Sequence, residues 1–193
     1  MRVSGYKSSE VQGLLFTQPL GNHGHVRTVV GDLAEKLTCK LVGGRRHKTQ
    51  STAEYCPDVS DGMGTYYESK ATGQSKQAFI YGGRLEKDKR FVAAGYNLSY
   101  VIWQHNAETK QVSTVEELRQ LVLQTMLGVH VVPFQKIADI CGLLPVEKLN
   151  SKYGEALSRP GTYGTGYRIN LSLLKQWFLV PTWLPEVKLF KEL

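Results

Sequence analysis

The chain has 193 residues, a length that suits one folded domain or one domain with an appendage. Hydrophobic residues make up 41% of it and charged residues 21%, which argues against disorder over most of its length. Its 24 Lys and Arg residues exceed its 17 Asp and Glu residues and leave a formal net charge of +7, so an anionic partner such as nucleic acid is favoured.

The cysteines and the apolar segments indicate the cellular compartment in which the protein is expected to function. Cys39, Cys56 and Cys141 show no CxxC spacing, so neither a disulfide framework nor a structural zinc site is expected. A reducing, cytoplasmic setting fits this pattern. The N-terminus has no signal-peptide pattern and no apolar run approaches the length of a membrane span, so we expect a soluble intracellular protein with no membrane partner.

The first recognisable element is a helix. Apolar residues recur at intervals of three and four over residues 26–41, which is typical of one helix face. Gly43 and Gly44 follow and are expected to end the helix, because glycine accepts left-handed backbone angles. The next stretch, 45–50, is polar and basic and could form a first short strand.

A β-hairpin is predicted after this strand. Residues 55–60 and 65–72 look like two antiparallel strands, since Asp61-Gly62 between them is a strong two-residue turn signal. Ser75 could then cap a helix that reaches about residue 91, and such a helical crossover allows a parallel strand after it.

The remaining pattern alternates strands and helices and then becomes irregular. The expected elements are a buried strand at 97–104, a helix at 115–127 capped by Ser113 or Thr114, a strand at 129–132 and a helix at 134–141. Further on we expect a surface loop at 159–168, a short apolar helix at 171–179 and an extended end around Pro181 and Pro185.

The hairpin carries the residues that point to chemistry. Side chains alternate faces along a strand, so Glu68 and Lys70 should lie on one side and Ser69 on the other. Asp58 lies in the partner strand of the same hairpin. Two carboxylates can bind a hard cation such as Mg²⁺, and a lysine beside them can position or help to deprotonate an attacking water.

Pro57-Asp58 followed by Glu68-Ser69-Lys70 resembles the signature of the PD-(D/E)XK nuclease superfamily, which includes restriction endonucleases, junction resolvases and phage nucleases. The superfamily core has the order αβββαβ, which is the order predicted here over residues 26–104. The resemblance implies an α/β fold with a restriction-endonuclease-like αβββαβ core, in which a mixed central sheet is flanked by helices, and a C-terminal extension.

The resemblance also implies an activity and a division of the chain. It implies a metal-dependent DNA endonuclease, bacterial or phage-encoded, that uses Mg²⁺, with Mn²⁺ as a substitute, and leaves a 5′-phosphate. Asp58 and Glu68 would hold the metal and Lys70 would act on the water. One nuclease domain would span 1–193, with the catalytic core at about 26–133 and an extension at about 134–193 for DNA recognition or oligomerisation.

Members of the superfamily often add an acidic residue from the first helix. Asp32 or Glu35 could fill that role here, and Glu35 is preferred because a G-x-x-A-E-like helix is frequent among members. A homo-oligomer, dimer or tetramer, is expected, since cutting both strands commonly needs two copies of one site.

Basic residues near the motif are candidates for DNA binding. Arg45, Arg46 and Lys48 lie in a basic run that could contact backbone phosphates, although a solvated loop is the alternative. Lys76 opens the helix predicted after the motif strand and faces either the scissile phosphate or water.

Two alternatives remain open at this stage. The C-terminal residues could read bases, which favours site-specific cleavage of the restriction or homing type over structure-specific cleavage of Holliday junctions. A non-catalytic nucleic-acid-binding protein is the second alternative, but a pure binder has no need of carboxylates beside phosphate.

Overall fold

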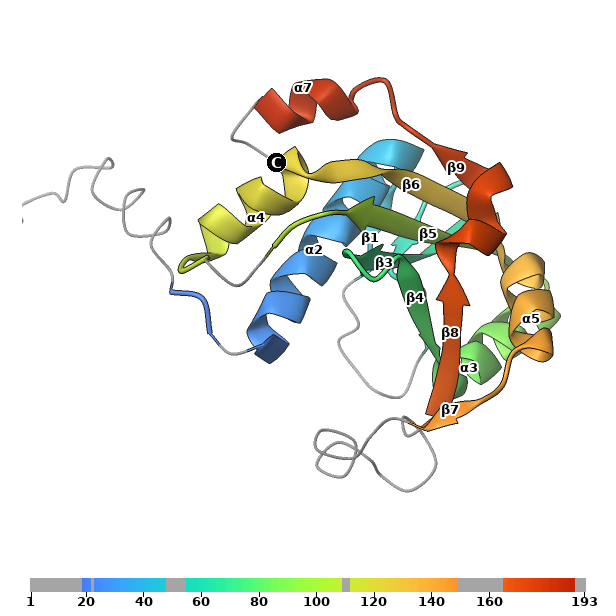
Figure 1. Cartoon of the computed structure of the whole chain (residues 1–193). Helices are drawn as coiled ribbons and strands as arrows, with labels where there is room; N and C mark the ends of the chain where they lie inside the picture. The colour runs from blue at the N-terminus through green and yellow to red at the C-terminus, as the bar shows by residue number, and fades with distance from the viewer. Residues whose placement is uncertain (1–18, 22, 48–54, 109–111, 149–164, 190–193) are drawn as a thin grey trace, which may run out of the picture.

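The computed structural model describes residues 19–21, 23–47, 55–108, 112–148 and 165–189. They form a mixed α/β structure, in which a six-stranded central sheet is flanked by helices and a three-stranded sheet lies beside it (Figure 1). The central sheet has the order β1-β2-β3-β5-β6-β9. Its strands are β1 Arg45–Arg46, β2 Val59–Ser60, β3 Thr65–Thr72, β5 Asn97–His105, β6 Met126–Pro133 and β9 Phe178–Leu179.

The pairing of these strands confirms the mixed sheet. β2 and β3 are antiparallel, as the hairpin pattern predicts, while β3 and β5 are parallel. The parallel pair is possible because the chain crosses over through α3 (Gly82–Ala93) between the two strands. All other neighbours in the central sheet are antiparallel.

Helix α2 (His23–Val42) covers one face of the central sheet. Leu33 and Leu37 are fully or almost fully buried against Trp103 and its neighbours in β5. The helix ends at Gly43, whose φ of 63° suits glycine, as the sequence predicts. Alternate residues of β5 point to opposite faces, so Tyr100 and Ile102 belong to a second core on the other side.

The connection of the hairpin is longer than the predicted two-residue turn. β2 ends at Ser60 and β3 begins at Thr65, and the carboxylate of Asp61 accepts hydrogen bonds from the backbone N–H groups of Met63, at 2.7 Å, and Thr65, at 3.1 Å. The aspartate therefore organises a wider loop rather than a tight turn. The strand predicted over 55–60 is also shorter, since only Val59 and Ser60 pair.

The helix predicted from Ser75 is wrong at its start. The chain instead forms β4 (Gln77–Tyr81) before α3 begins at Gly82. β4 pairs with β8 (Thr165–Asn170), and β8 pairs with β7 (Glu147–Lys148) to complete the second sheet. Ala78 and Ile80 are buried in alternation, which is the strand period that the sequence analysis missed.

The C-terminal part is built into the same structure. Helix α4 (Val115–Gln124) is capped by Thr114, as predicted, but it ends before 127 because β6 already begins at Met126. Helix α5 (Phe134–Leu143) packs on the second core. The 3₁₀ helix η2 (Leu171–Trp177) leads into β9, and the predicted extended end is wrong, since α7 (Leu184–Leu189) packs beside α4 (Figure 1).

The surface loop predicted over 159–168 also ends differently. Residues 165–168 belong to β8, and the rest of that segment lies outside the described residues. None of the helices in the described ranges combines the length and apolar character that crossing a membrane requires.

Candidate active site

Asp58 is placed directly before β2 and reaches across to β3. Its Oδ2 accepts a hydrogen bond from the backbone N–H of Ser69 at 2.8 Å, and its backbone carbonyl accepts one from His47 at 2.8 Å. The Ser69 hydroxyl points away from this carboxylate to α2, where it lies 2.9 Å from the hydroxyl of Thr38. Asp58 is therefore attached to the motif strand itself.

Glu68 and Lys70 lie on one side of β3, as the strand alternation predicts. The Lys70 ammonium forms an ion pair with Oε1 of Glu68. Glu68 is only 2% exposed, whereas the side chain of Lys70 is 26% exposed. The charges of both residues act on the carboxyl of Asp58. The three motif residues therefore come together at one place.

Arg84 is a fourth member of this cluster that the sequence analysis missed. It projects from the first turn of α3, and its guanidinium pairs with Oε2 of Glu68. The same guanidinium lies over the ring of Tyr55, 4.4 Å from its centroid. The i, i+4 spacing of Arg84 and Asp88 was visible in the sequence, since the predicted helix contains both, but it gave no sign of the contact with Glu68.

Two aspartates near this cluster have unusual acidities: Asp58 is half-buried and Asp88 is fully buried. Burial raises the pKa of Asp58 to about 7, and the negative charge of Glu68 adds to this, while Lys70 and the Ser69 N–H act in the opposite direction. Burial also raises the pKa of Asp88 to about 7, against the hydrogen bond from Tyr100. Perturbed carboxyl groups of this kind are frequent at functional sites.

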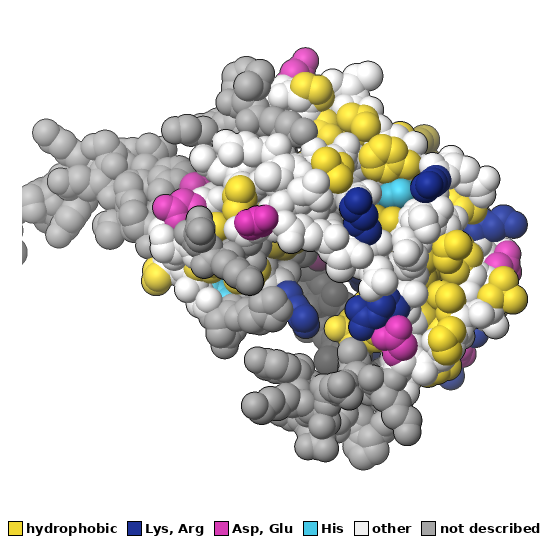
Figure 2. Space-filling view, in the orientation of Figure 1, with side chains coloured by type: hydrophobic (Ala, Val, Ile, Leu, Met, Phe, Trp, Pro, Cys, Tyr) yellow, Lys and Arg dark blue, Asp and Glu magenta, His cyan; other side chains and the backbone are white. Residues whose placement is uncertain are grey.

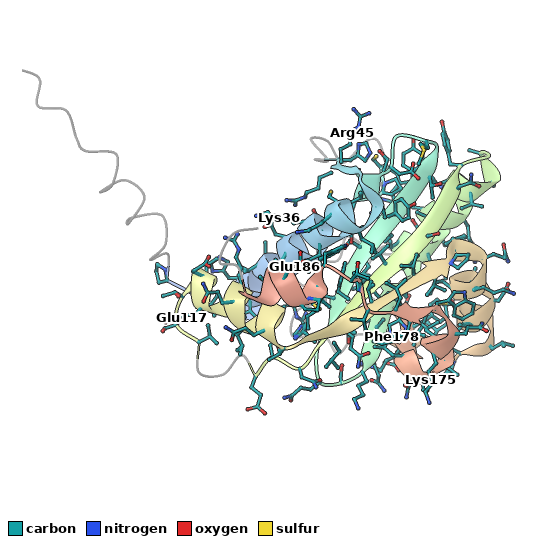
Figure 3. The ribbon with its side chains drawn as sticks, turned by 90° about the horizontal axis from the view of Figure 1, so that it is seen from above. Lys36, Arg45, Glu117, Lys175, Phe178 and Glu186 are labelled. Carbon is teal, nitrogen blue, oxygen red and sulfur yellow. The ribbon has the colours of Figure 1, made fainter. Side chains whose placement is uncertain are left out.

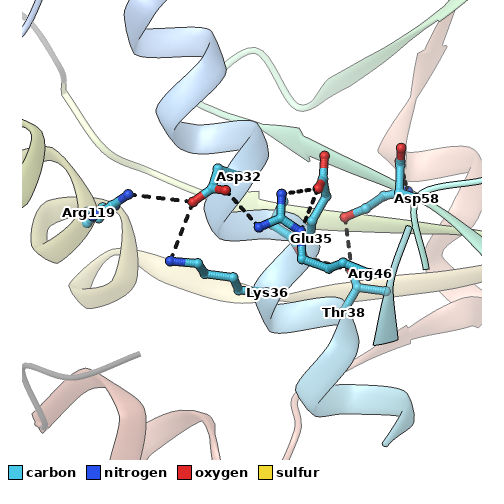
Figure 4. A network of polar contacts seen from close by, with 9 residues as sticks. Asp32, Glu35, Lys36, Thr38, Arg46, Asp58 and Arg119 are labelled. Carbon is cyan, nitrogen blue, oxygen red and sulfur yellow. Dashed lines mark hydrogen bonds and ion pairs between the residues drawn. The ribbon is translucent and has the colours of Figure 1, made fainter. Parts of the chain in front are cut away.

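The two acidic residues of α2 that were candidates for the site, Asp32 and Glu35, are both paired with Arg46. Arg46 donates from Nε to Glu35 at 2.9 Å and from Nη1 to Asp32 at 2.8 Å (Figure 4). Asp32 also pairs with Lys36 and Arg119, each at 3.5 Å. The carboxylate of Glu35, the predicted additional metal ligand, is therefore engaged by Arg46.

The structure describes three of the four predicted DNA-binding residues. Arg45 is exposed, whereas Arg46 is held by the two acids of α2. Lys48 lies outside the described residues. Lys76 is in the turn before β4, not at the start of a helix, and lines a pocket together with Lys175. Figure 3 shows Arg45 and Lys175 at well-separated places on the molecule.

The carboxylates of Asp58 and Glu68 are the groups of this cluster that could bind a divalent cation. No group of three or more His, Cys, Asp and Glu side chains suited to a metal occurs among the described residues. Mg²⁺, however, is commonly bound by one or two carboxylates together with water and phosphate oxygens. Asp58 is held through Oδ2 by the Ser69 N–H, while both oxygens of Glu68 face cations. The two carboxylates fit Mg²⁺ if Lys70 or Arg84 releases one oxygen of Glu68.

Comparisons of the chain with models of known protein families, with curated proteins and with solved structures found no match.

Proposed function

We propose that the protein is a magnesium-dependent DNA endonuclease that hydrolyses phosphodiester bonds. The single observation that carries the proposal is the seating of the Asp58 carboxylate on the Ser69 N–H, next to Glu68 and Lys70. Two acids and a lysine from one hairpin meet at a partly open place, which is the combination that metal-assisted phosphate hydrolysis requires. Apart from β4, which belongs to the second sheet, the order α2, β1, β2, β3, α3, β5 is that of a restriction-endonuclease-like core, and this supports the proposal.

Each residue of the cluster has a definite task in this proposal. Asp58 and Glu68 would hold Mg²⁺, which supplies a more acidic bound water and neutralises charge on the phosphate. Lys70 is already next to a carboxylate of this pair, so its ammonium can hold the attacking water in line. Arg84 can leave Glu68 and donate to a non-bridging phosphate oxygen, for which its planar fork is suited.

The charge balance of the cluster also suits a phosphate substrate. Asp58 and Glu68 contribute two negative charges when ionised, and Lys70 and Arg84 contribute two positive charges. Without the cations, two carboxylates would repel a phosphodiester. A protein that only binds nucleic acid gains nothing from burying these acids, so hydrolysis explains the cluster better than binding alone.

The type of cleavage is proposed to be site-specific, of the restriction or homing type, and a structure-specific, Holliday-junction-resolving enzyme is the alternative. Residues 165–189 are built onto the core through β8, β9 and α7. A homo-oligomer, dimer or tetramer, remains part of the proposal, because two sites are commonly needed to cut both strands.

The test is a cleavage assay on purified protein with Mg²⁺ and a panel of linear, supercoiled and four-way-junction DNAs. We expect cutting by the wild type and at least a 100-fold loss of rate in Asp58→Asn, because an amide is a poor ligand for Mg²⁺. Asp139→Asn is the matched control, since this aspartate is exposed on α5. DNA binding without cutting in Mg²⁺ or Mn²⁺ would support the non-catalytic alternative, and unchanged cutting by Asp58→Asn would remove Asp58 from the site.

A further inference from the structure

A pocket lies away from Glu68 and Arg84, where the second sheet meets the end of the central one. Its volume is about 440 Å³, and it is bordered by the turn before β4, the end of β8, and η2. β6 and β9 contribute His130 and Phe178 to its wall. Figure 2 shows a histidine between Lys and Arg side chains, next to hydrophobic side chains, on the part of the surface where η2 and β9 lie.

The pocket is positively charged. Lys76 and Lys175 both line it, and no Asp or Glu does. Neither lysine forms an ion pair with a carboxylate of the described residues. Two unpaired ammonium groups at one cavity attract a phosphate, and neutral hydrogen-bonding groups, the side chains of Asn170 and Ser172, lie beside them.

The backbone holds Lys76 in an unusual conformation. Its φ of 51° makes it the only non-glycine residue with a left-handed backbone in the ranges that the structure describes. The turn is fixed on both sides, because the Lys76 N–H donates to Gly73 at 3.1 Å and the Lys76 carbonyl accepts from Leu171 at 2.9 Å. Such conformations persist where the surrounding structure imposes them, and they concentrate at binding sites.

The wall of the pocket also offers a flat apolar surface. The ring of Phe178 is 39% exposed and has its centroid 4.9 Å from the ring of His130. Its edge lies against the bare backbone of Gly128, where an added Cβ would meet the ring at 2.5 Å. A ring held in this way and still open to solvent suits stacking on a planar base.

The pocket and the candidate active site share one face of the central sheet. Lys70 is paired with Ile102 across β3 and β5, and Ile102 is paired with His130 across β5 and β6. Residues paired across strands project to the same side, so Lys70 and His130 lie on one face, two strand spacings apart. That separation is about 10 Å, and Ile102, which is fully buried in the second core, lies between the two residues.

We propose that this pocket binds one nucleotide of a DNA strand, with its phosphate between Lys76 and Lys175 and its base against Phe178. Asn170 and Ser172 then supply hydrogen bonds to the base or the sugar. The inference rests on the proposed nuclease function, because that function identifies the ligand as a DNA strand. The binding itself needs no metal, so it can be measured separately from cleavage.

The experiment is a titration of fluorescently labelled single-stranded DNA into the full chain in EDTA, at several salt concentrations. We expect Lys175→Gln to weaken binding several-fold and to reduce the slope of log K against log salt by about one, and Lys76→Gln to do the same. Phe178→Leu should weaken binding about fivefold or more without changing the salt slope, because stacking carries no counterion release. Lys136→Gln, an exposed lysine on α5, is the matched control.

Competition with free ligands shows whether the pocket recognises a whole nucleotide or only its phosphate. Deoxynucleoside monophosphate should displace the strand, and inorganic phosphate should displace it less well, because phosphate cannot use Phe178. Equal competition by inorganic phosphate would overturn the role of the base. Affinity and salt slope in Lys175→Gln and Phe178→Leu that match Lys136→Gln would overturn the site, whatever the cleavage assay shows. Melting curves of each variant establish that the fold is intact. Lys175 lies in η2, outside the strained turn at Lys76, so Lys175→Gln keeps the test valid if Lys76→Gln unfolds.

Discussion

The guanidinium of Arg84 on α3 is paired with the carboxylate of Glu68 on β3. Glu68 is almost fully buried, and its other oxygen is paired with Lys70. Arg84 Nε is buried without a hydrogen-bond partner in the described part of the chain and lies 3.6 Å from Asp88. If the proposed metal site is correct, Arg84 would compete with the metal for Glu68, and its own hydrogen-bonding capacity is incompletely used where it lies.

Arg84→Gln should tighten Mg²⁺ binding by a few-fold while lowering the rate of DNA cleavage. The affinity rises because one cation is removed from a proposed metal ligand, and the rate falls because the phosphate loses its bidentate donor. Calorimetry with Mg²⁺ and a single-turnover cleavage assay measure the two effects. Arg90→Gln, in the last turn of the same helix, is the control. Weaker metal binding in a folded Arg84→Gln protein would mean that Arg84 only supports the structure.

Lys70→Ala should stop turnover by a different route. Both carboxylates remain, so Mg²⁺ or Mn²⁺ should still bind, but the water loses the group that holds it in line, and we expect a loss of about 100-fold or more in rate. Metal affinity from calorimetry and the cleavage rate are compared in the same protein preparation. Loss of metal binding together with activity would assign Lys70 to the structure of the site and not to its chemistry.

The stability of the metal-free protein should fall as the pH rises from about 4 to about 7, and should change little above that. Asp88 is fully buried and burial raises its pKa to about 7, above the value of about 4 in an unfolded chain. A group whose pKa is raised by folding stabilises the fold below its unfolded pKa, and this contribution is lost as the pH passes the folded pKa. Asp58 titrates in the same range and acts in the same direction.

The variant Asp88→Asn should show a weaker pH dependence than the wild type. An amide of the same shape cannot ionise, so the variant avoids a cost on the order of a few kcal/mol above pH 7. Urea unfolding at pH 5, 6, 7 and 8 in EDTA is the measurement, with Asp139→Asn as the exposed control. A wild type whose stability does not fall between pH 5 and 7 would show that Tyr55, Tyr100 and Arg84 keep Asp88 ionised.

The sequence predicted the elements whose signal is local. The stripe of apolar residues in α2, the alternation that puts Glu68 and Lys70 together, and the buried run in β5 depend on residues a few positions apart, and the structure confirms all three. The capping pattern of Thr114 and Glu117 likewise lies within one turn of helix.

The missed features depend on contacts between distant parts of the chain. β4 forms a strand because β8, about 90 residues later, pairs with it and buries Ile80 and Ile169 together. The residues of β4 itself, from Gln77 to Tyr81, gave no local sign of that partner strand. Arg84 was missed because its partner Glu68 lies on another element, 16 residues earlier in the chain.

The last prediction concerns the metal. An all-oxygen site formed by Asp58, Glu68 and water suits Mg²⁺ and Mn²⁺, and Ca²⁺ should occupy the same carboxylates. Ca²⁺ accepts more ligands at longer distances, so Lys70 and Arg84 would then hold water and phosphate in a poorer line for attack. We therefore expect DNA binding in Ca²⁺ without cutting, cutting in Mg²⁺ or Mn²⁺, and no cutting after metal removal. The measurement is a cleavage and binding assay on metal-stripped protein with one metal added at a time. Robust cutting in EDTA would rule out the metal mechanism and the roles of both carboxylates, whereas activity in zinc alone would place the chemistry at nitrogen or sulfur ligands instead.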